Sequence, residues 1–171
     1  MNDRRAHLRF GFLIAGGVFV VDQASKWWIV ETVMKPPRLI EVAPFFNLVM
    51  GWNRGVSFGL LSSHAEAAAW GLVALALAIS AGLVYWLARV EKRFLALAIG
   101  LVIGGALGNV IDRIRYGAVA DFLDFHAFGY HWPAFNAADT AISVGAALIV
   151  VDALFDDAKS PKSKTPENKK T

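Results

Sequence analysis

Four stretches of this chain are apolar over about 20 residues each, which is the length of helix that crosses a bilayer. Four such stretches in 171 residues, of which 56% are hydrophobic, leave too little polar surface for a soluble helical protein. We therefore predict a mainly α-helical, polytopic membrane protein whose residues 1–158 form one four-span domain. The expected transmembrane helices run approximately from Leu8 to Val30, Ala65 to Ala88, Phe94 to Ile111 and Ala137 to Phe155.

The distribution of Lys and Arg predicts the orientation. Most of the 17 basic residues lie in the N-terminal tail, in the link between the second and third spans, and in the C-terminal tail. With four spans these three regions share one side, so the positive-inside rule places both termini in the cytoplasm. We expect residues 159–171, rich in Lys, Ser and Pro, to form a disordered basic cytoplasmic tail. No aromatic residues interleave these charges, so the partner expected for them is membrane phospholipid and not nucleic acid.

Two longer segments connect the spans on the opposite side. In residues 32–64, the runs Arg38–Val42 and Phe45–Met50 are strand-like and are bounded by Pro and Gly. They predict a small extracytoplasmic β-sheet on the membrane surface, followed by a short helix near Val56–Leu61. The second segment, residues 114–136, is aromatic-rich and is expected to be a loop.

The third span carries glycines at every fourth position, Gly100, Gly104 and Gly108. They lie on one helical face, and small residues spaced this way let another helix backbone approach closely. We interpret this face as a helix-packing surface.

Two carboxylates near the ends of apolar segments, Asp121 and Asp139, are the leading candidates for chemistry, because ionisable groups at membrane depth are costly. The pattern Asn-x-x-Asp occurs at Asn109–Asp112 and again at Asn136–Asp139, which places both pairs at the same end of the spans. The segment between these spans can fold back and bring Asp121 beside Asp139. Two adjacent carboxylates share a proton, so one acts as general base on a water and the other as general acid.

Several of these residues also have structural interpretations. Asn136 is a possible N-cap of the fourth helix, and the helix dipole would favour Asp139 in its first turn. Asp112 next to an arginine suggests a charge network. Asp22 and Lys26, four residues apart in the first span, suggest a buried ion pair whose lysine extends outward.

Another carboxylate, Asp124, rivals Asp121 as the partner of Asp139, and spacing alone does not exclude it.

Metal and thiol chemistry are not indicated. The chain has no cysteine, and its four histidines are dispersed without a HExxH motif or a pair at i and i+4. The first span contains charged residues and is not followed by a small-x-small cleavage site, so we expect it to remain uncleaved. We predict no metal site and no organic cofactor.

Several short sequence blocks, in the same order along the chain, resemble those of the lipoprotein signal peptidase family (signal peptidase II). The members of this family are bacterial membrane aspartic peptidases. The resemblance covers residues of about 8–155. The blocks are Asp22-Gln-Ala-Ser-Lys26, Asn53-Arg-Gly-Val-Ser-Phe-Gly59, Gly104-Gly-Ala-Leu-Gly-Asn-Val-Ile-Asp-Arg113, Val119-Ala-Asp121-Phe and Phe135-Asn-Ala-Ala-Asp139.

The resemblance implies specific site residues. It makes Asp121 and Asp139 the catalytic dyad and sets Asp124 aside. The residues implied to contact substrate are Asn53, Asn109, Arg113 and Asn136. Asp22, Lys26 and Asp112 remain assigned to a structural charge network.

The resemblance also implies the reaction. The substrate would be a prolipoprotein whose cysteine already carries a diacylglyceryl group, and the cut would fall just before that cysteine. The enzyme would lie in the bacterial cytoplasmic (inner) membrane with its site near the outer face, and it would act as a monomer. The alternative is a small transporter or channel that uses interfacial carboxylates as a proton relay. Other intramembrane aspartic proteases carry a Gly-x-Gly-Asp motif, which this chain lacks.

Overall fold

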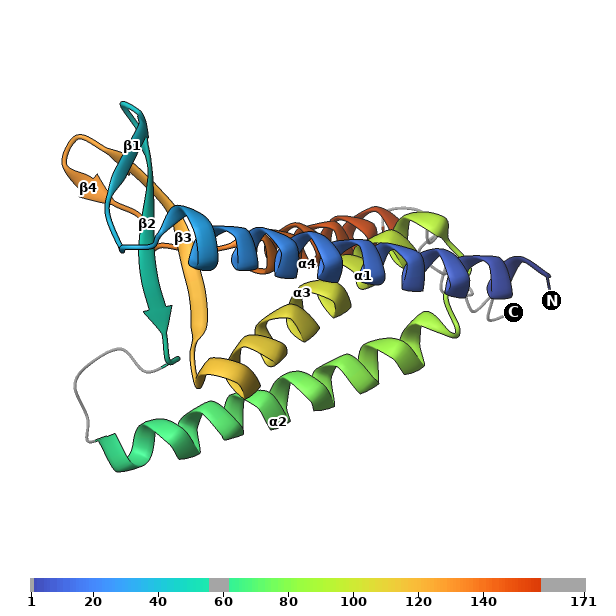
Figure 1. Cartoon of the computed structure of the whole chain (residues 1–171). Coiled ribbons are helices and arrows are strands. Elements are labelled where there is room, and N and C mark those ends of the chain that lie inside the picture. Colours follow the sequence, from blue (N-terminus) through green and yellow to red (C-terminus); the bar gives the residue numbers. More distant parts are fainter. Residues whose placement is uncertain (1, 56–61, 158–171) are drawn as a thin grey trace, which may run out of the picture.

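Four long helices dominate the protein, whose computed structural model describes residues 2–55 and 62–157. Each is long and apolar enough to cross a membrane, which confirms the predicted four-span fold. They run alongside one another, with a small sheet at one end (Figure 1). The predicted short helix near Val56–Leu61 and the predicted tail at 159–171 lie outside the described residues. The helices are α1 (Asn2–Trp28), continued by the π-helix η1 (Ile29–Val33), α2 (Ser62–Leu87), α3 (Arg93–Tyr116) and α4 (Ala137–Asp157).

Helix α3 is the centre of the bundle. In its most apolar stretch 61% of the residues are buried inside the protein, compared with 17% for each of the other three spans. It contacts α1, α2 and α4, whereas α1 and α2 touch each other little. Residues on α3 can therefore reach functional groups on every other span.

Glycines allow this close packing on two faces of α3. A Cβ atom on Gly104 would lie 2.5 Å from the backbone oxygen of Ala15 on α1. A Cβ atom on the next residue, Gly105, would lie 2.5 Å from the backbone oxygen of Ala138 on α4. The predicted packing role of the 100/104/108 face is thus confirmed, with α1 as the partner helix.

The sheet has four antiparallel strands in the order β1 (Ile40–Ala43), β2 (Phe46–Asn53), β3 (Val119–Ala127) and β4 (Tyr130–His131). Strands β1 and β2 match the two predicted strand-like runs. The second connecting segment was expected to be a loop, and that expectation is wrong, because it forms β3 and β4. Its Val119–Phe125 portion pairs with β2 and satisfies the backbone groups that β2 would otherwise leave unpaired.

The third span is longer than predicted. It continues past Ile111 to Tyr116 and stops at Gly117, whose left-handed backbone (φ 68°) forms the C-cap and whose N–H donates to the Arg113 carbonyl over 3.0 Å. The polar residues that suggested an earlier end are compatible with the helix, because Asp112 is buried against partners inside the protein. This extra length brings the polar end of α3 to the sheet.

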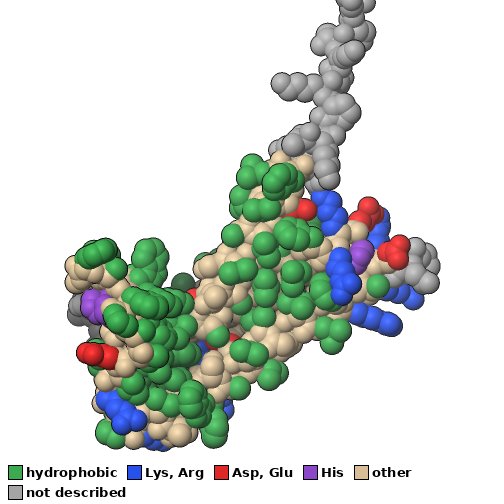
Figure 2. All heavy atoms as spheres, turned by 90° about the horizontal axis from the view of Figure 1, so that it is seen from above, with side chains coloured by type: hydrophobic (Ala, Val, Ile, Leu, Met, Phe, Trp, Pro, Cys, Tyr) green, Lys and Arg blue, Asp and Glu red, His purple; other side chains and the backbone are tan. Residues whose placement is uncertain are grey.

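Hydrophobic side chains cover much of the outer surface of the helices and of the sheet, and Lys and Arg side chains lie at both ends of the bundle (Figure 2). The sheet and its β3–β4 turn expose large apolar groups, including Phe45, Phe128 and Trp132. Aromatic side chains are enriched where a protein meets the membrane–water interface. This surface is compatible with a sheet that rests on the membrane.

Candidate active site

Asp121 on β3 and Asp139 in the first turn of α4 are joined by two asparagine side chains. The Asn136 amide nitrogen donates to the Asp121 carboxylate over 2.7 Å, and the Asn109 amide nitrogen donates to the Asp139 carboxylate over 2.8 Å. The two asparagines also meet, with the Asn136 nitrogen 3.4 Å from the Asn109 side-chain oxygen. The two copies of the Asn-x-x-Asp pattern therefore contribute to one connected polar cluster.

The start of α4 fixes Asp139 by a reciprocal cap. The Asn136 side-chain oxygen accepts from the Asp139 N–H over 3.0 Å, and the Asp139 carboxylate accepts from the Asn136 N–H over 3.2 Å. This is the arrangement of a capping box. The capping interpretation of these two residues is correct, and it does not exclude a chemical role. Both Asp139 oxygens have a donor, so the carboxylate is held in one orientation.

Burial raises the pKa of Asp121 to about 6, against an ordinary value of 3.8, because its side chain is taken out of water. Hydrogen bonds from Asn53 and Asn136 and the charge of Lys26 act in the opposite direction. The negative charge of Asp139 adds to the rise. A carboxyl that holds a proton near pH 6, close to a second carboxylate, is suited to general acid–base chemistry.

Asn53 and Arg113 reach the same cluster from other elements. Asn53 ends β2, opposite Val119, and its side chain interacts with Asp121. The Arg113 guanidinium on α3 is attracted by the charges of Asp139 and Asp121.

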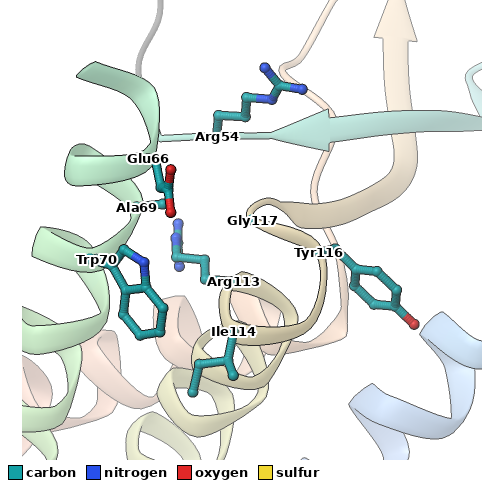
Figure 3. A pocket seen from close by; sticks show the side chains of 8 residues that line it. All are labelled: Arg54, Glu66, Ala69, Trp70, Arg113, Ile114, Tyr116 and Gly117. Carbon is teal, nitrogen blue, oxygen red and sulfur yellow. The ribbon is translucent and has the colours of Figure 1, made fainter. Parts of the chain in front are cut away.

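A cavity of about 350 Å³ lies beside Arg113, between α2, α3 and the end of β2. Arg54, Glu66 and Trp70 line it together with Arg113, and the Glu66 and Arg113 side chains point toward each other there (Figure 3). The buried Arg113 Nε has no hydrogen-bond partner among the described residues, so the guanidinium retains a free donor.

The charge network predicted from Asp22, Lys26 and Asp112 is present. The Lys26 ammonium lies 2.9 Å from carboxylate oxygens of both Asp22 and Asp112. The expectation that Lys26 extends outward is wrong, since only 4% of the residue is exposed. Two carboxylates and the Asn109 side-chain oxygen surround its ammonium, so it needs no contact with water.

This network also supports backbone at the site. Asp112 accepts the Ala120 N–H on β3 over 3.1 Å, and Asp22 accepts the Ala138 N–H on α4 over 2.9 Å. Each of these amides lies next to one of the two paired aspartates in the sequence. The buried charges therefore hold the backbone on which Asp121 and Asp139 sit.

Asp124 lies apart from this cluster. It is three residues from Asp121 on β3, so its side chain leaves the opposite face of the strand. Burial alone would raise its pKa, but hydrogen bonds from His131 and from Asn47 hold the pKa of Asp124 below its ordinary value. A carboxylate that stays ionised and is already paired at 2.9 Å with His131 is poorly suited to share a proton.

Within residues 2–55 and 62–157, no group of three His, Asp or Glu side chains is placed to hold a metal ion. The side chains that meet in the cluster around Asp121 and Asp139 are carboxylates, amides and one guanidinium.

Four spanning helices with a pair of amide-bound aspartates at one end are the arrangement expected of a membrane peptidase of the aspartic type. The family model described as signal peptidase (SPase) II matches residues 14–155, and the chain belongs to that family.

Individual relatives support the same family assignment. A lipoprotein signal peptidase of Methylobacterium sp. (strain 4-46) is 41% identical, over 94% of this chain and 98% of the relative. That of Aeromonas hydrophila is 43% identical, over 97% and 99%. A solved structure described as a bacterial membrane enzyme is similar with a TM-score of 0.74 and 36% identity, and the match covers 92% of this chain and 94% of that one. These similarities support a peptidase and give no support to the transporter alternative.

Proposed function

We propose that this protein removes signal peptides from diacylglyceryl-modified prolipoproteins, cutting just before the lipid-modified cysteine, with Asp121 and Asp139 as the catalytic dyad. Membership of the signal peptidase II family supports the reaction. The observation that carries the residue assignment is the pair of asparagine bridges, Asn136 to Asp121 at 2.7 Å and Asn109 to Asp139 at 2.8 Å. They hold two carboxyl groups in one cluster at the end of the spans.

In the proposed reaction the dyad holds one proton and one water. The ionised aspartate takes a proton from the water, which attacks the scissile carbonyl carbon. The protonated aspartate donates to the oxygen that becomes negatively charged, and a proton then passes to the amine of the departing cysteine. The raised pKa of Asp121 supports its holding the shared proton, while the two N–H donors on Asp139 support the ionised form there.

The remaining polar groups bind the substrate, stabilise the oxyanion or position the dyad in this proposal. Asn53 sits at the end of a strand beside Asp121, where an extended peptide can lie along the sheet. Arg113 has a free Nε–H and carries a positive charge near both aspartates, so it can stabilise the developing oxyanion. Asn109 and Asn136 hold the carboxyls in place, and no metal or organic cofactor takes part.

The proposed setting is the bacterial cytoplasmic (inner) membrane, with both termini in the cytoplasm and the site near the outer face. The basic residues in the N-terminal part of α1, in the link between α2 and α3, and in the C-terminal segment of the sequence support this orientation through the positive-inside rule and through contact with anionic phospholipid. All residues assigned to the site come from one chain, which supports action as a monomer.

The experiment that tests this function uses the purified full-length protein in lipid. A synthetic lipobox peptide with a diacylglyceryl cysteine is the substrate, and the same peptide with an unmodified cysteine is the control. The proposal expects cleavage of the lipidated peptide only, with the new N-terminus at the modified cysteine. Absence of cleavage, or a cut at another bond, would contradict it.

A further inference from the structure

A hollow and a groove meet next to Asp139. The hollow, about 410 Å³, is lined by Asp139 together with aromatic and polar residues of the β4–α4 connection and α4. The groove, about 480 Å³, runs between α1 and α4 with α3 as its floor. Thr140 and Val144 line both, so the two spaces adjoin along this edge of α4.

The groove offers only apolar contacts. The Thr140 hydroxyl already donates to the Asn136 carbonyl over 3.0 Å, which leaves its methyl group for packing. Along α1 the lining extends from Val21 to Leu13, a distance of about 12 Å at 1.5 Å per residue. Gly17 lies midway along this wall, and a Cβ atom there would have nothing within 4 Å. The groove therefore has the shape and chemistry of a slot for a hydrocarbon chain.

The substrate places a hydrocarbon chain at this position. The glyceryl group is attached through the sulfur of the residue that directly follows the scissile bond. When the scissile carbonyl reaches the dyad, the glyceryl group must lie within a few bonds of Asp139. The hollow lined by Asp139 can accept it, and the groove then leads away from it along the spans.

We propose that the groove between α1 and α4, from Thr140 to Leu13, binds one acyl chain of the substrate's diacylglyceryl group. This inference rests on the proposed function. Bulk lipid tails are as apolar as the groove, so the groove gains little free energy from burial as such. The chain tethered next to Asp139 has a high effective concentration there, which favours it over phospholipid tails. The groove thus aligns the lipidated cysteine with the dyad.

The test fills the groove without disturbing the packing. Gly17→Phe places a ring in open space within the groove, and Gly82→Phe on α2 is the matched control, because a Cβ atom at Gly82 also has nothing within 4 Å. Each variant is assayed with two lipobox peptides that differ only in carrying palmitoyl or butyryl chains. The quantity compared is kcat/KM for the long-chain peptide divided by kcat/KM for the short-chain peptide. Gly17→Phe is expected to lower this ratio about tenfold, which is the loss in kcat/KM typical when a pocket loses an apolar contact. Gly82→Phe is expected to leave this ratio at the parental value.

A ratio unchanged by Gly17→Phe would overturn the proposal and would mean that bulk lipid or nothing fills the groove. If the parental protein cleaves neither peptide, the proposed function fails, and cross-linking then tests the groove directly. A long-chain peptide with a diazirine on its acyl chain should label residues 13–21 of α1, and excess unlabelled peptide should compete. A phospholipid that carries a diazirine on its acyl chain is the control. If it labels the same residues and excess peptide does not displace it, the assignment of the groove to the substrate's acyl chain is contradicted.

Discussion

Lys26 and Asn109 meet inside the bundle, where the Lys26 ammonium donates to the Asn109 side-chain oxygen over 2.9 Å. An ammonium group can only donate, so this contact turns the oxygen of the amide toward Lys26 and its nitrogen away. The nitrogen then points to Asp139, which accepts from it over 2.8 Å. The buried cation on α1 thereby sets the orientation of the amide that holds Asp139.

This relationship predicts the effect of Asn109→Asp. A carboxylate at position 109 still accepts from Lys26, so the fold should be retained, but it cannot donate to Asp139. Cleavage should fall roughly 10- to 100-fold, because a hydrogen bond to a charged group contributes about 1.5–3 kcal/mol. The measurement is kcat/KM on the lipidated peptide, with thermal unfolding recorded in parallel.

Asn47→Asp is the matched control for that substitution. Asn47 also donates to an aspartate, Asp124, over 3.1 Å, but this pair lies in the sheet away from the dyad. The control variant should keep most of its activity. Equal losses in Asn109→Asp and Asn47→Asp would show that the bridge to Asp139 has no special role.

Helix packing at Gly104 gives a second prediction. Gly104→Ala forces a methyl group against the Ala15 backbone oxygen, where the space is 2.5 Å, and overpacking of this kind typically costs about 1–3 kcal/mol. The unfolding temperature in detergent should fall. Gly82→Ala, on a helix face with open space, should leave it unchanged or raise it, since alanine has the higher helix propensity. The reverse order of the two variants would refute the packing described for α3.

The raised pKa of Asp121 predicts how stability changes with pH. Its stabilising contribution is fully present below the ordinary value of 3.8 and is lost as the pH rises through about 6, because the folded protein favours the protonated form. The change is about 3 kcal/mol, at 1.36 kcal/mol per pKa unit. Asp121→Asn cannot titrate, so its unfolding free energy should depend less on pH across this window and should exceed the parental value at neutral pH. Identical pH profiles would contradict the assignment of a raised pKa to Asp121.

The orientation in the membrane gives a further prediction. A reporter inserted in the β3–β4 turn at Gly129 should behave as external, and one fused after the last residue should behave as cytoplasmic. Both insertion points leave the packed helices intact. A cytoplasmic signal from the Gly129 insertion would reverse the proposed topology.

The sequence predicts the transmembrane helices well because a long run of apolar residues is a strong and local feature. Twenty apolar residues identify a helix whatever surrounds them, and the glycine spacing of α3 identifies its packing face. The strands β3 and β4 were not predicted, because a short strand owes its existence to the neighbour it pairs with. The segment Val119–Phe125 does not alternate between apolar and polar residues, so its Val and Phe residues are the local sign of β3 that the sequence offers.

The sequence marks the residues of the candidate site but not their geometry. The repeated Asn-x-x-Asp pattern marks both asparagines, yet only the folded protein shows that each amide binds an aspartate. For Lys26, the pairing at i and i+4 identified Asp22 but not Asp112 or Asn109, which come from a helix 83 or more residues away in the chain. Long-range contacts of this kind cannot be inferred from local spacing.

The central claim is the dyad, and the most direct test compares Asp121→Asn, Asp139→Asn and Asp124→Asn as full-length proteins in lipid. Asparagine is nearly isosteric with aspartate but cannot carry the proton, so the first two variants should fold, bind the lipidated peptide and fail to cleave it. The double variant should be about as inactive as either single one, because the two groups act as a unit. Asp124→Asn should retain substantial cleavage, since Asp124 is bound to Asn47 and His131 instead. Parental cleavage rates in both Asp121→Asn and Asp139→Asn, or loss of cleavage in Asp124→Asn alone, would contradict the account.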